Sequence, residues 1–267
     1  MKLLKRCYLG LILLFLYAPI LVLIVFSFNS SRSRAVWGGF TLDWYRLMLR
    51  DSQIRDALSN TMSIAFLAAI TATVIGTVAA IGINAMTKRS RKAVLNINNI
   101  PILNPDIVTG VSIMMLFVFS VTVLRVGKMG YMTMLLSHIT FCIPYVITSV
   151  LPKLRILDKR LYEAALDLGA TPVVAFFKVI LPELLPSIIS GAILAFTLSI
   201  DDFVISFFTT GAGVNNLAIM IYTSAAKRGI KPEINALSTF IFGGVMILLF
   251  LINYVDTRNS KKEAKRM

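Results

Sequence analysis

The chain has 267 residues, of which 57% are hydrophobic, and its mean hydropathy is +0.80. A soluble fold of this size cannot bury that much apolar surface, so a soluble globular protein is excluded and lipid is the expected solvent. The net charge of +14 would suit nucleic-acid binding, but the basic residues lie mainly between the apolar runs. This placement indicates a membrane protein with no nucleic-acid partner.

Six apolar runs are long enough to cross a bilayer, which takes about 20 residues at the helical rise. The runs are continuous and do not alternate, so they predict helices and not a β-barrel. The first run is long and no small-residue cleavage site ends it, which favours a retained anchor. The expected fold class is all-α, a single transmembrane domain over residues 1–267 with spans at about 8–28, 58–86, 94–120, 131–151, 186–207 and 233–255.

The basic residues predict the orientation of these spans. With the N-terminus inside, the inner segments hold 17 of the 27 Lys and Arg residues, and KRSRK at 88–92 is their densest group. Positive charge favours the cytoplasmic side of a membrane. Both termini, 87–93 and 153–185 are therefore expected to be cytoplasmic. The 88–92 cluster itself can be read as a solvated turn with no partner.

Two spans carry local signals. The second contains Gly76, Gly82 and many Ala and Thr residues, which let membrane helices approach closely, so it is expected inside the bundle. The third contains Asn104, Pro105 and Asp106, and the proline predicts a kink or break because it removes a backbone donor. Asn104 and Asp106 can then line a pathway or satisfy the backbone groups that the proline frees, and the sequence favours neither reading.

The polar stretch 153–185 predicts two short helices outside the bilayer. Asp158 can cap the first and Gly169 can end it, while Thr171 and Pro172 suit the N-cap and first position of the second.

This stretch also resembles a family signature. Glu163, Ala164 and Ala165 are followed by Gly169 after three residues, and by Leu181 and Pro182 at the end of VILP. The spacing is that of the cytoplasmic loop of ABC importer permeases, except that Val179 stands where the family favours Ile. The resemblance implies that the loop docks on a separate ATPase subunit and carries its closure into the membrane. The alternative is an ordinary amphipathic surface helix.

The resemblance extends over nearly the whole chain. WGGFTLDWY (37–45), NPDIVTGVSIMMLF (104–117) and LSIDDFVISFFTTG (198–211) look like the second permease subunit of spermidine/putrescine importers. This implies the type-I ABC importer permease fold, with six transmembrane helices and a cytoplasmic coupling-helix loop, in the bacterial inner membrane. The implied partners are a homologous second permease, a dimer of ATPase subunits and an extracytoplasmic polyamine-binding protein. The lipid bilayer surrounds the chain itself.

ATP and Mg²⁺ are expected on the ATPase subunit, because this chain contains no phosphate-binding loop of the G-x-x-x-x-G-K-[ST] type. We therefore expect a transport subunit with no catalytic residue, metal site or cofactor of its own.

Asp201 and Asp202 are adjacent acids in an otherwise apolar stretch. An ionised Asp at the bilayer centre costs roughly 2.5–3.5 kcal/mol on insertion scales. Since adjacent helical positions point about 100° apart, we expect one acid to face the pathway and attract a polycation, and the other to cap a helix end or pair with the partner subunit. Alternatively, both are solvated near the outer interface. Phe203 and Tyr222 can add aromatic faces for ammonium groups.

The single histidine, His138, favours a hydrogen bond between helices over a proton relay. Two other functional classes are also weighed. An ion-coupled secondary transporter commonly shows inverted repeats. An intramembrane metalloprotease would carry the motif H-E-x-x-H. The sequence shows neither an inverted repeat nor this motif. A permease for another small solute of the same class stays open.

Overall fold

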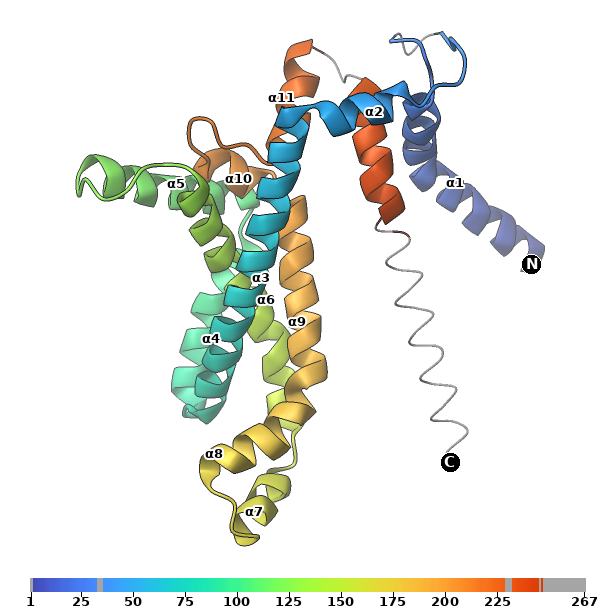
Figure 1. The fold of residues 1–267 in the computed structure, drawn as a ribbon. Helices are drawn as coiled ribbons and strands as arrows, with labels where there is room; N and C mark the ends of the chain where they lie inside the picture. Colours follow the sequence, from blue (N-terminus) through green and yellow to red (C-terminus); the bar gives the residue numbers. More distant parts are fainter. Residues whose placement is uncertain (1, 33–35, 229–231, 245, 247–267) are drawn as a thin grey trace. The chain divides into compact units, whose positions relative to one another are not determined.

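The computed structural model describes residues 2–32, 36–228, 232–244 and 246. It divides into two compact units, one formed by residues 1–55 with 221–267 and the other by residues 56–220. The described residues are overwhelmingly helical (Figure 1), with one isolated β-bridge between Asn29 and Phe40. This confirms the all-α fold class.

Four helical runs in the described part of the chain are long and apolar enough to cross a membrane, or five if a bent pair is counted as one span. They come from α1 (Lys2–Ser27), α3 (Ser52–Ala85), α6 (Tyr131–Ile156) and the helical run Pro172–Asp201, with α4 (Lys88–Leu103) and α5 (Asp106–Thr122) as the bent pair. The expected sixth span is helical over residues 232–244. The expected segment 247–255 lies outside the described residues.

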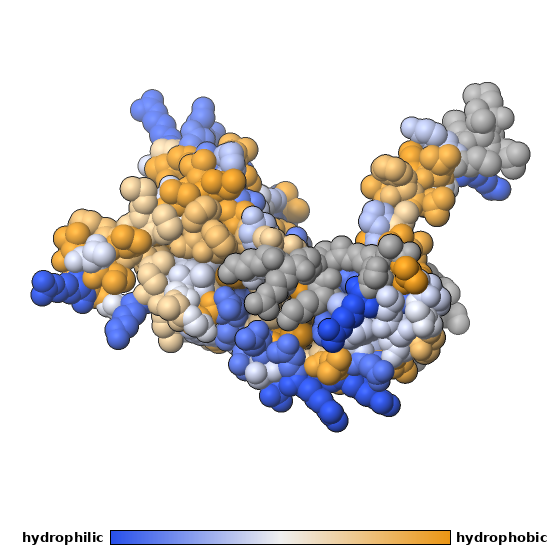
Figure 2. Space-filling view, turned by 90° about the horizontal axis from the view of Figure 1, so that it is seen from above, coloured by the Kyte–Doolittle hydropathy of each residue, from blue (hydrophilic) through white to orange (hydrophobic). Residues whose placement is uncertain are grey.

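The surface suits a lipid environment. On α1, Leu11 is 67% exposed and Phe15 is 79% exposed. Figure 2 shows hydrophobic residues, in orange, over much of the described surface, with hydrophilic side chains in blue gathered into groups. Such an apolar surface is stable against lipid and costly in water.

The first unit also contains α2 (Asp43–Arg50). Its Trp44 is buried and donates from Nε1 to the backbone oxygen of Asn29 at 2.6 Å. Phe28 stacks on Phe40 with ring centroids 5.4 Å apart. These contacts fold the segment after α1 back on itself.

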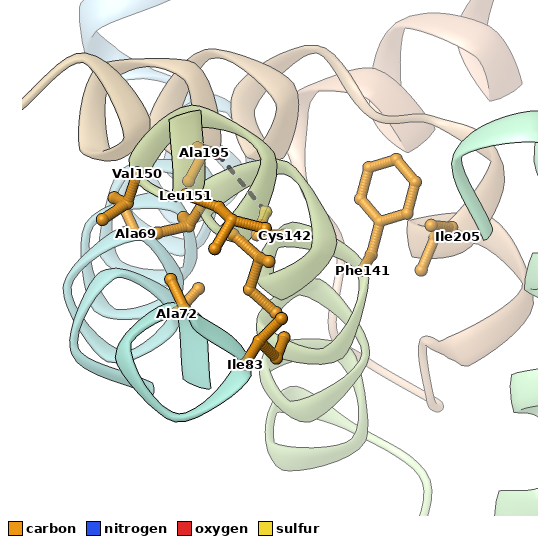
Figure 3. Packing of buried hydrophobic residues seen from close by; sticks show 12 residues of the cluster. Ala69, Ala72, Ile83, Phe141, Cys142, Val150, Leu151, Ala195 and Ile205 are labelled. Carbon is orange, nitrogen blue, oxygen red and sulfur yellow. Dashed lines mark hydrogen bonds between the residues drawn. The ribbon is translucent and has the colours of Figure 1, made fainter. Parts of the chain in front are cut away.

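In the second unit, α6 lies at the centre of the core. Val146 of α6 comes so near α3 that a Cβ added to Gly76 would lie 2.8 Å from its Cβ. On the other side, a Cβ on Gly191 of α9 (Leu181–Asp201) would lie 3.3 Å from Ser149 Cβ. Figure 3 shows the apolar cluster between these helices. The close approach expected at Gly76 is confirmed, whereas at Gly82 no atom from another part of the described residues lies within 4 Å of a Cβ built there.

The third and fifth spans are both broken. The chain bends by 105° between α4 and α5, so the kink or break expected at Pro105 within the third span is confirmed. The fifth helix ends at Asp201 and a separate short helix, α10 (Val204–Thr209), follows. A continuous span over 186–207 is therefore wrong, because Asp202 adopts an extended conformation.

The 153–185 stretch begins as predicted. Asp158 caps α7 (Lys159–Asp167) and Thr171 caps α8 (Pro172–Ala175). The second helix is not separate, however, because it continues through a π-helical turn, η1 (Phe176–Ile180), into α9. Pro182 has no N–H to donate, and the N–H of Leu181 reaches back five residues to Phe176. The proline thus produces a π-turn instead of a helix end.

Candidate functional site

Asp201 and Asp202 lie at the elbow between α9 and α10 and have different surroundings. The Asp202 carboxyl group accepts hydrogen bonds from the backbone N–H of Ser206 at 2.8 Å and of Ile205 at 3.3 Å. Its side chain is only 6% exposed. Asp201 is the last residue of α9 and is exposed. Asp202 therefore caps α10, whereas the Asp201 carboxyl group is open to a ligand.

A buried hydrogen-bond network holds this elbow. His138 on α6 bonds Ser199 of α9 through Nδ1 at 2.7 Å and Ser206 of α10 through Nε2 at 2.9 Å. Asn216, just before α11 (Leu217–Arg228), donates from Nδ2 to the same Ser206 hydroxyl at 2.7 Å. The helix-to-helix role expected for His138 is confirmed.

The donors and acceptors of this network assign the histidine tautomer. Ser206 donates its one hydroxyl proton to the backbone oxygen of Asp202, since a carbonyl can only accept. Its oxygen must then accept from His138 Nε2–H. The other ring nitrogen, Nδ1, accepts from the Ser199 hydroxyl. Every polar group of the network is satisfied with a neutral histidine, as burial requires.

The break between α4 and α5 lies beside the elbow. At Gly110 of α5, an added Cβ would lie 3.1 Å from the Phe208 ring and 3.5 Å from Val204 of α10. The Asp106 carboxyl group is near enough to interact electrostatically with Asp202. The structure therefore gathers acids from two distant helix breaks into one region.

Asn104 and Asp106 both have exposed side chains. The backbone N–H of Asn104 bonds the oxygen of Ile100, the last i→i−4 bond of α4. The helix ends there because the next residue, Pro105, has no N–H to continue the pattern.

Aromatic rings follow the acids. Phe203 lies 5.4 Å from Phe207, centroid to centroid, and Phe207 lies 5.6 Å from Phe208. The Phe207 ring is 43% exposed. The other aromatic candidate, Tyr222, is on α11 in the other unit and is 53% exposed. Phe203 therefore belongs to the acidic region, and Tyr222 is not assigned to it.

The signature residues of the 153–185 loop build a turn between α7 and α8. Gly169 has φ of +86°, a backbone conformation that suits glycine. Its N–H bonds Leu166 O at 2.9 Å, and the N–H of Ala170 bonds Ala165 O at 3.1 Å, which is a Schellman ending. The turn presents Leu168, 89% exposed, at its tip.

The other signature residues lie nearby. Glu163 is exposed and lines a cavity of about 450 Å³ with residues from the ends of α3 and α6. Ala164 is exposed as well. Leu181 and Pro182 begin α9, directly after the π-helical turn η1. An ion pair of 3.4 Å between Lys153 and Glu183 fastens this end of α9 to α6.

Sequence reasoning missed Ser206, Asn216 and Gly110. Ser206 lies 68 residues from His138 in the chain, and no local pattern marks such a pair. A small residue at Gly110, directly after the break at Pro105, was the one available signal for close packing.

Comparison with known proteins identifies the chain. Residues 72–258 match the family described as "Binding-protein-dependent transport system inner membrane component". The chain belongs to this family. The permease is 40% identical to the putrescine transport system permease protein PotI of Escherichia coli K12, over 94% of this chain and 90% of that protein. It is 38% identical to the spermidine/putrescine transport system permease protein PotC of the same organism, over 94% and 92%.

Solved structures share the fold of the permease. A chain of a bacterial ABC transporter that imports the acidic polysaccharide alginate superposes with a TM-score of 0.72 at 18% identity, covering 96% of each chain. A chain of the MetNI methionine ABC transporter superposes with a TM-score of 0.56 at 20% identity, over 82% of the permease and 97% of that chain. The expected ABC importer permease fold is confirmed.

Proposed function

We propose that the permease forms one half of the translocation pathway of an ATP-driven polyamine importer. The observation that carries this proposal is the acidic region at the two helix breaks, where the exposed Asp201 adjoins the capping residue Asp202, and Asp202 lies near enough to Asp106 to interact with it electrostatically. The identity of 36–40% to putrescine and spermidine/putrescine permeases supports the same cargo.

The chemistry of this region suits a polyamine. Its ammonium groups are stabilised by opposite charge and by the negative faces of aromatic rings. Exposed acids within a membrane-crossing bundle usually face a water-filled cavity or a protein interior. We therefore place Asp201 on the pathway, with Asn104, Asp106 and Phe203 beside it, and give Asp202 the task of holding the elbow.

The pathway needs partners. A second homologous permease would complete the pathway. A dimer of ATPase subunits, holding ATP and Mg²⁺, would dock on the loop from Glu163 to Pro182 and transmit its closure to the membrane helices through that loop. The turn at Gly169 projects Leu168 for such docking. A polyamine-binding protein would deliver the cargo from outside. In one solved relative of the fold, an alginate transporter is in complex with a periplasmic protein bound to an alginate pentasaccharide.

A permease for a different solute is the second candidate. Transporters with names as different as alginate and methionine share this fold, so the fold does not determine the cargo.

Uptake by the reconstituted transporter distinguishes a polyamine importer from an importer of a different solute. The permease, its partner permease, the ATPase and the binding protein are placed in proteoliposomes, and labelled putrescine and spermidine are supplied. We expect accumulation that needs both ATP and the binding protein, with vesicles lacking the binding protein as the control. Accumulation of another solute with no polyamine uptake would reject the polyamine cargo while retaining the importer.

A further inference from the structure

A strongly basic cavity lies away from the acidic region. It measures about 480 Å³ and is formed by the first part of α4 and the end of α6. Four cations and no acid are among the described residues that line it, which are Lys88, Arg91, Lys92, Leu95, Asn96, Asn99 and Arg155.

The α4 side of this cavity is a single stripe. Lys88, Lys92, Asn96 and Asn99 are spaced by four, four and three residues, so they share one helix face. At 1.5 Å per residue the stripe is roughly 16 Å long. The two cations lie at its N-terminal end and the two neutral amides follow. A ligand with an anionic end and a polar but uncharged neck matches this order.

Within the described part of the chain, no acid neutralises the positive charge of this cavity. The first turn of α4 contains no acid, although a helix N-terminus already carries a positive partial charge and favours acids. On α6, Lys153 pairs with Glu183, whereas Arg155 has no ion pair among the described residues. Repulsion among these groups is relieved when an anion binds.

Arg91 has a different task. Its guanidinium group donates to the backbone oxygens of Ile83 at 3.1 Å and Asn84 at 2.5 Å, in the last turn of α3, and of Met86 at 2.9 Å, directly after it. These bonds hold α4 against the end of α3 and thereby orient the stripe toward α6. Arg91 is a positioning residue for the cavity, and it is left unchanged in the test below.

We propose that this cavity binds a phosphate group. Basic pockets between membrane helices are suited to anionic lipid headgroups, and the cavity opens at the ends of helices that cross the membrane, so a phospholipid such as phosphatidylglycerol is the expected source. Lys88, Lys92 and Arg155 contact the phosphate, and the two asparagine amides donate to the glycerol and ester oxygens. A polycation is repelled here, which separates this cavity from the proposed cargo route.

Native mass spectrometry of the assembled transporter tests this. Phosphatidylglycerol is titrated against phosphatidylcholine, and inorganic phosphate is supplied as a competitor. The test variant is Lys88→Gln/Lys92→Gln/Arg155→Gln, and the matched control is Arg125→Gln/Lys128→Gln, two exposed cations of the loop before α6. We expect the test variant to lose at least about tenfold in affinity for phosphatidylglycerol and the control to keep it. Lys92→Gln alone is a milder variant if the triple variant assembles poorly.

Each other outcome is decisive. Unchanged phosphatidylglycerol affinity in the test variant overturns the proposal. If inorganic phosphate displaces the lipid at similar concentration, the cavity is supported as a phosphate-binding site and its ligand is soluble phosphate. Loss of the ATPase subunit with unchanged lipid binding assigns the cavity to a protein partner and overturns the proposal. No polyamine is present, so the result is independent of the proposed cargo.

Discussion

His138 Nε2 on α6 lies 2.9 Å from the hydroxyl oxygen of Ser206 on α10, 68 residues further along the chain. This bond ties α6, which lies at the centre of the core of the second unit, to the short helix that follows the two adjacent acids. The geometry of the acidic region therefore depends on a residue that is not itself acidic or exposed.

His138→Ala should destabilise the permease. It removes the acceptor of the Ser199 hydroxyl proton and one of the two donors to the Ser206 hydroxyl oxygen, and a buried polar group left unsatisfied costs about 1–3 kcal/mol. We expect a lower thermal unfolding midpoint for the purified transporter. Thr140→Ala is the control, because the exposed Thr140 hydroxyl bonds the backbone oxygen of Leu136 in its own helix. Equal midpoints for the two variants would contradict the structural role of the network.

The two adjacent acids should respond differently to substitution. Asp201→Asn removes an exposed charge that makes no side-chain bond to the other described residues, so we expect normal assembly with polyamine uptake lowered at least about tenfold, equivalent to roughly 1.4 kcal/mol. Uptake of labelled putrescine and spermidine into proteoliposomes measures this. Full uptake would remove Asp201 from the cargo route.

Asp202 should act through the fold. Asp202→Ala removes the cap of α10 and should cost about 1 kcal/mol of stability, whereas Asp202→Asn keeps an oxygen acceptor and should cost less. Thermal unfolding of the two variants compares them. An Asp202→Asn variant as unstable as Asp202→Ala would show that charge matters more than capping.

Gly169→Val should uncouple the proposed ATPase from the membrane part. At φ of +86°, a β-branched residue is strained by about 1–3 kcal/mol, so the turn presenting Leu168 should distort. We expect normal membrane insertion, with loss of uptake and of the ATP hydrolysis stimulated by loaded binding protein. Gly169→Asn is the control, because asparagine tolerates this conformation. Wild-type transport by Gly169→Val and by Glu163→Lys would reject the coupling role.

Gly76 and Gly82 form a matched pair on α3. An added side chain at position 76 meets Val146 at 2.8 Å, whereas position 82 is open. Overpacking typically costs about 1–3 kcal/mol. Gly76→Leu should therefore reduce the yield of folded permease in size-exclusion chromatography, and Gly82→Leu should not. A reduced yield in both variants would indicate that position 82 meets a partner subunit.

Single cysteines test the expected orientation. Cys7 and Cys142 are first replaced by alanine, and then Ser90→Cys or Ala170→Cys is introduced. An impermeant maleimide should label these positions only after the cells are permeabilised, because the basic loops favour the cytoplasm. Ser31→Cys is the control, expected to react in intact cells. Labelling of position 90 or 170 in intact cells would reverse the topology.

Local chemistry in the sequence determined a large part of this protein. Apolar length specified membrane helices, Pro105 specified the break before α5, and Asp158 and Thr171 specified the starts of α7 and α8. In each case the cause lies within a few residues of its effect, since caps, prolines and left-handed glycines act on neighbouring backbone groups. The family signature is equally local.

Only the tertiary structure decided the different roles of residues that look equivalent in the sequence. It separated Gly76 from Gly82 and Asp202 from Asp201. It also brought Arg155 of α6 to the basic stripe of α4, and Ser206 to His138. These assignments depend on contacts between segments far apart in the chain, and side-chain packing, which sets such contacts, leaves no mark in the local pattern of residues.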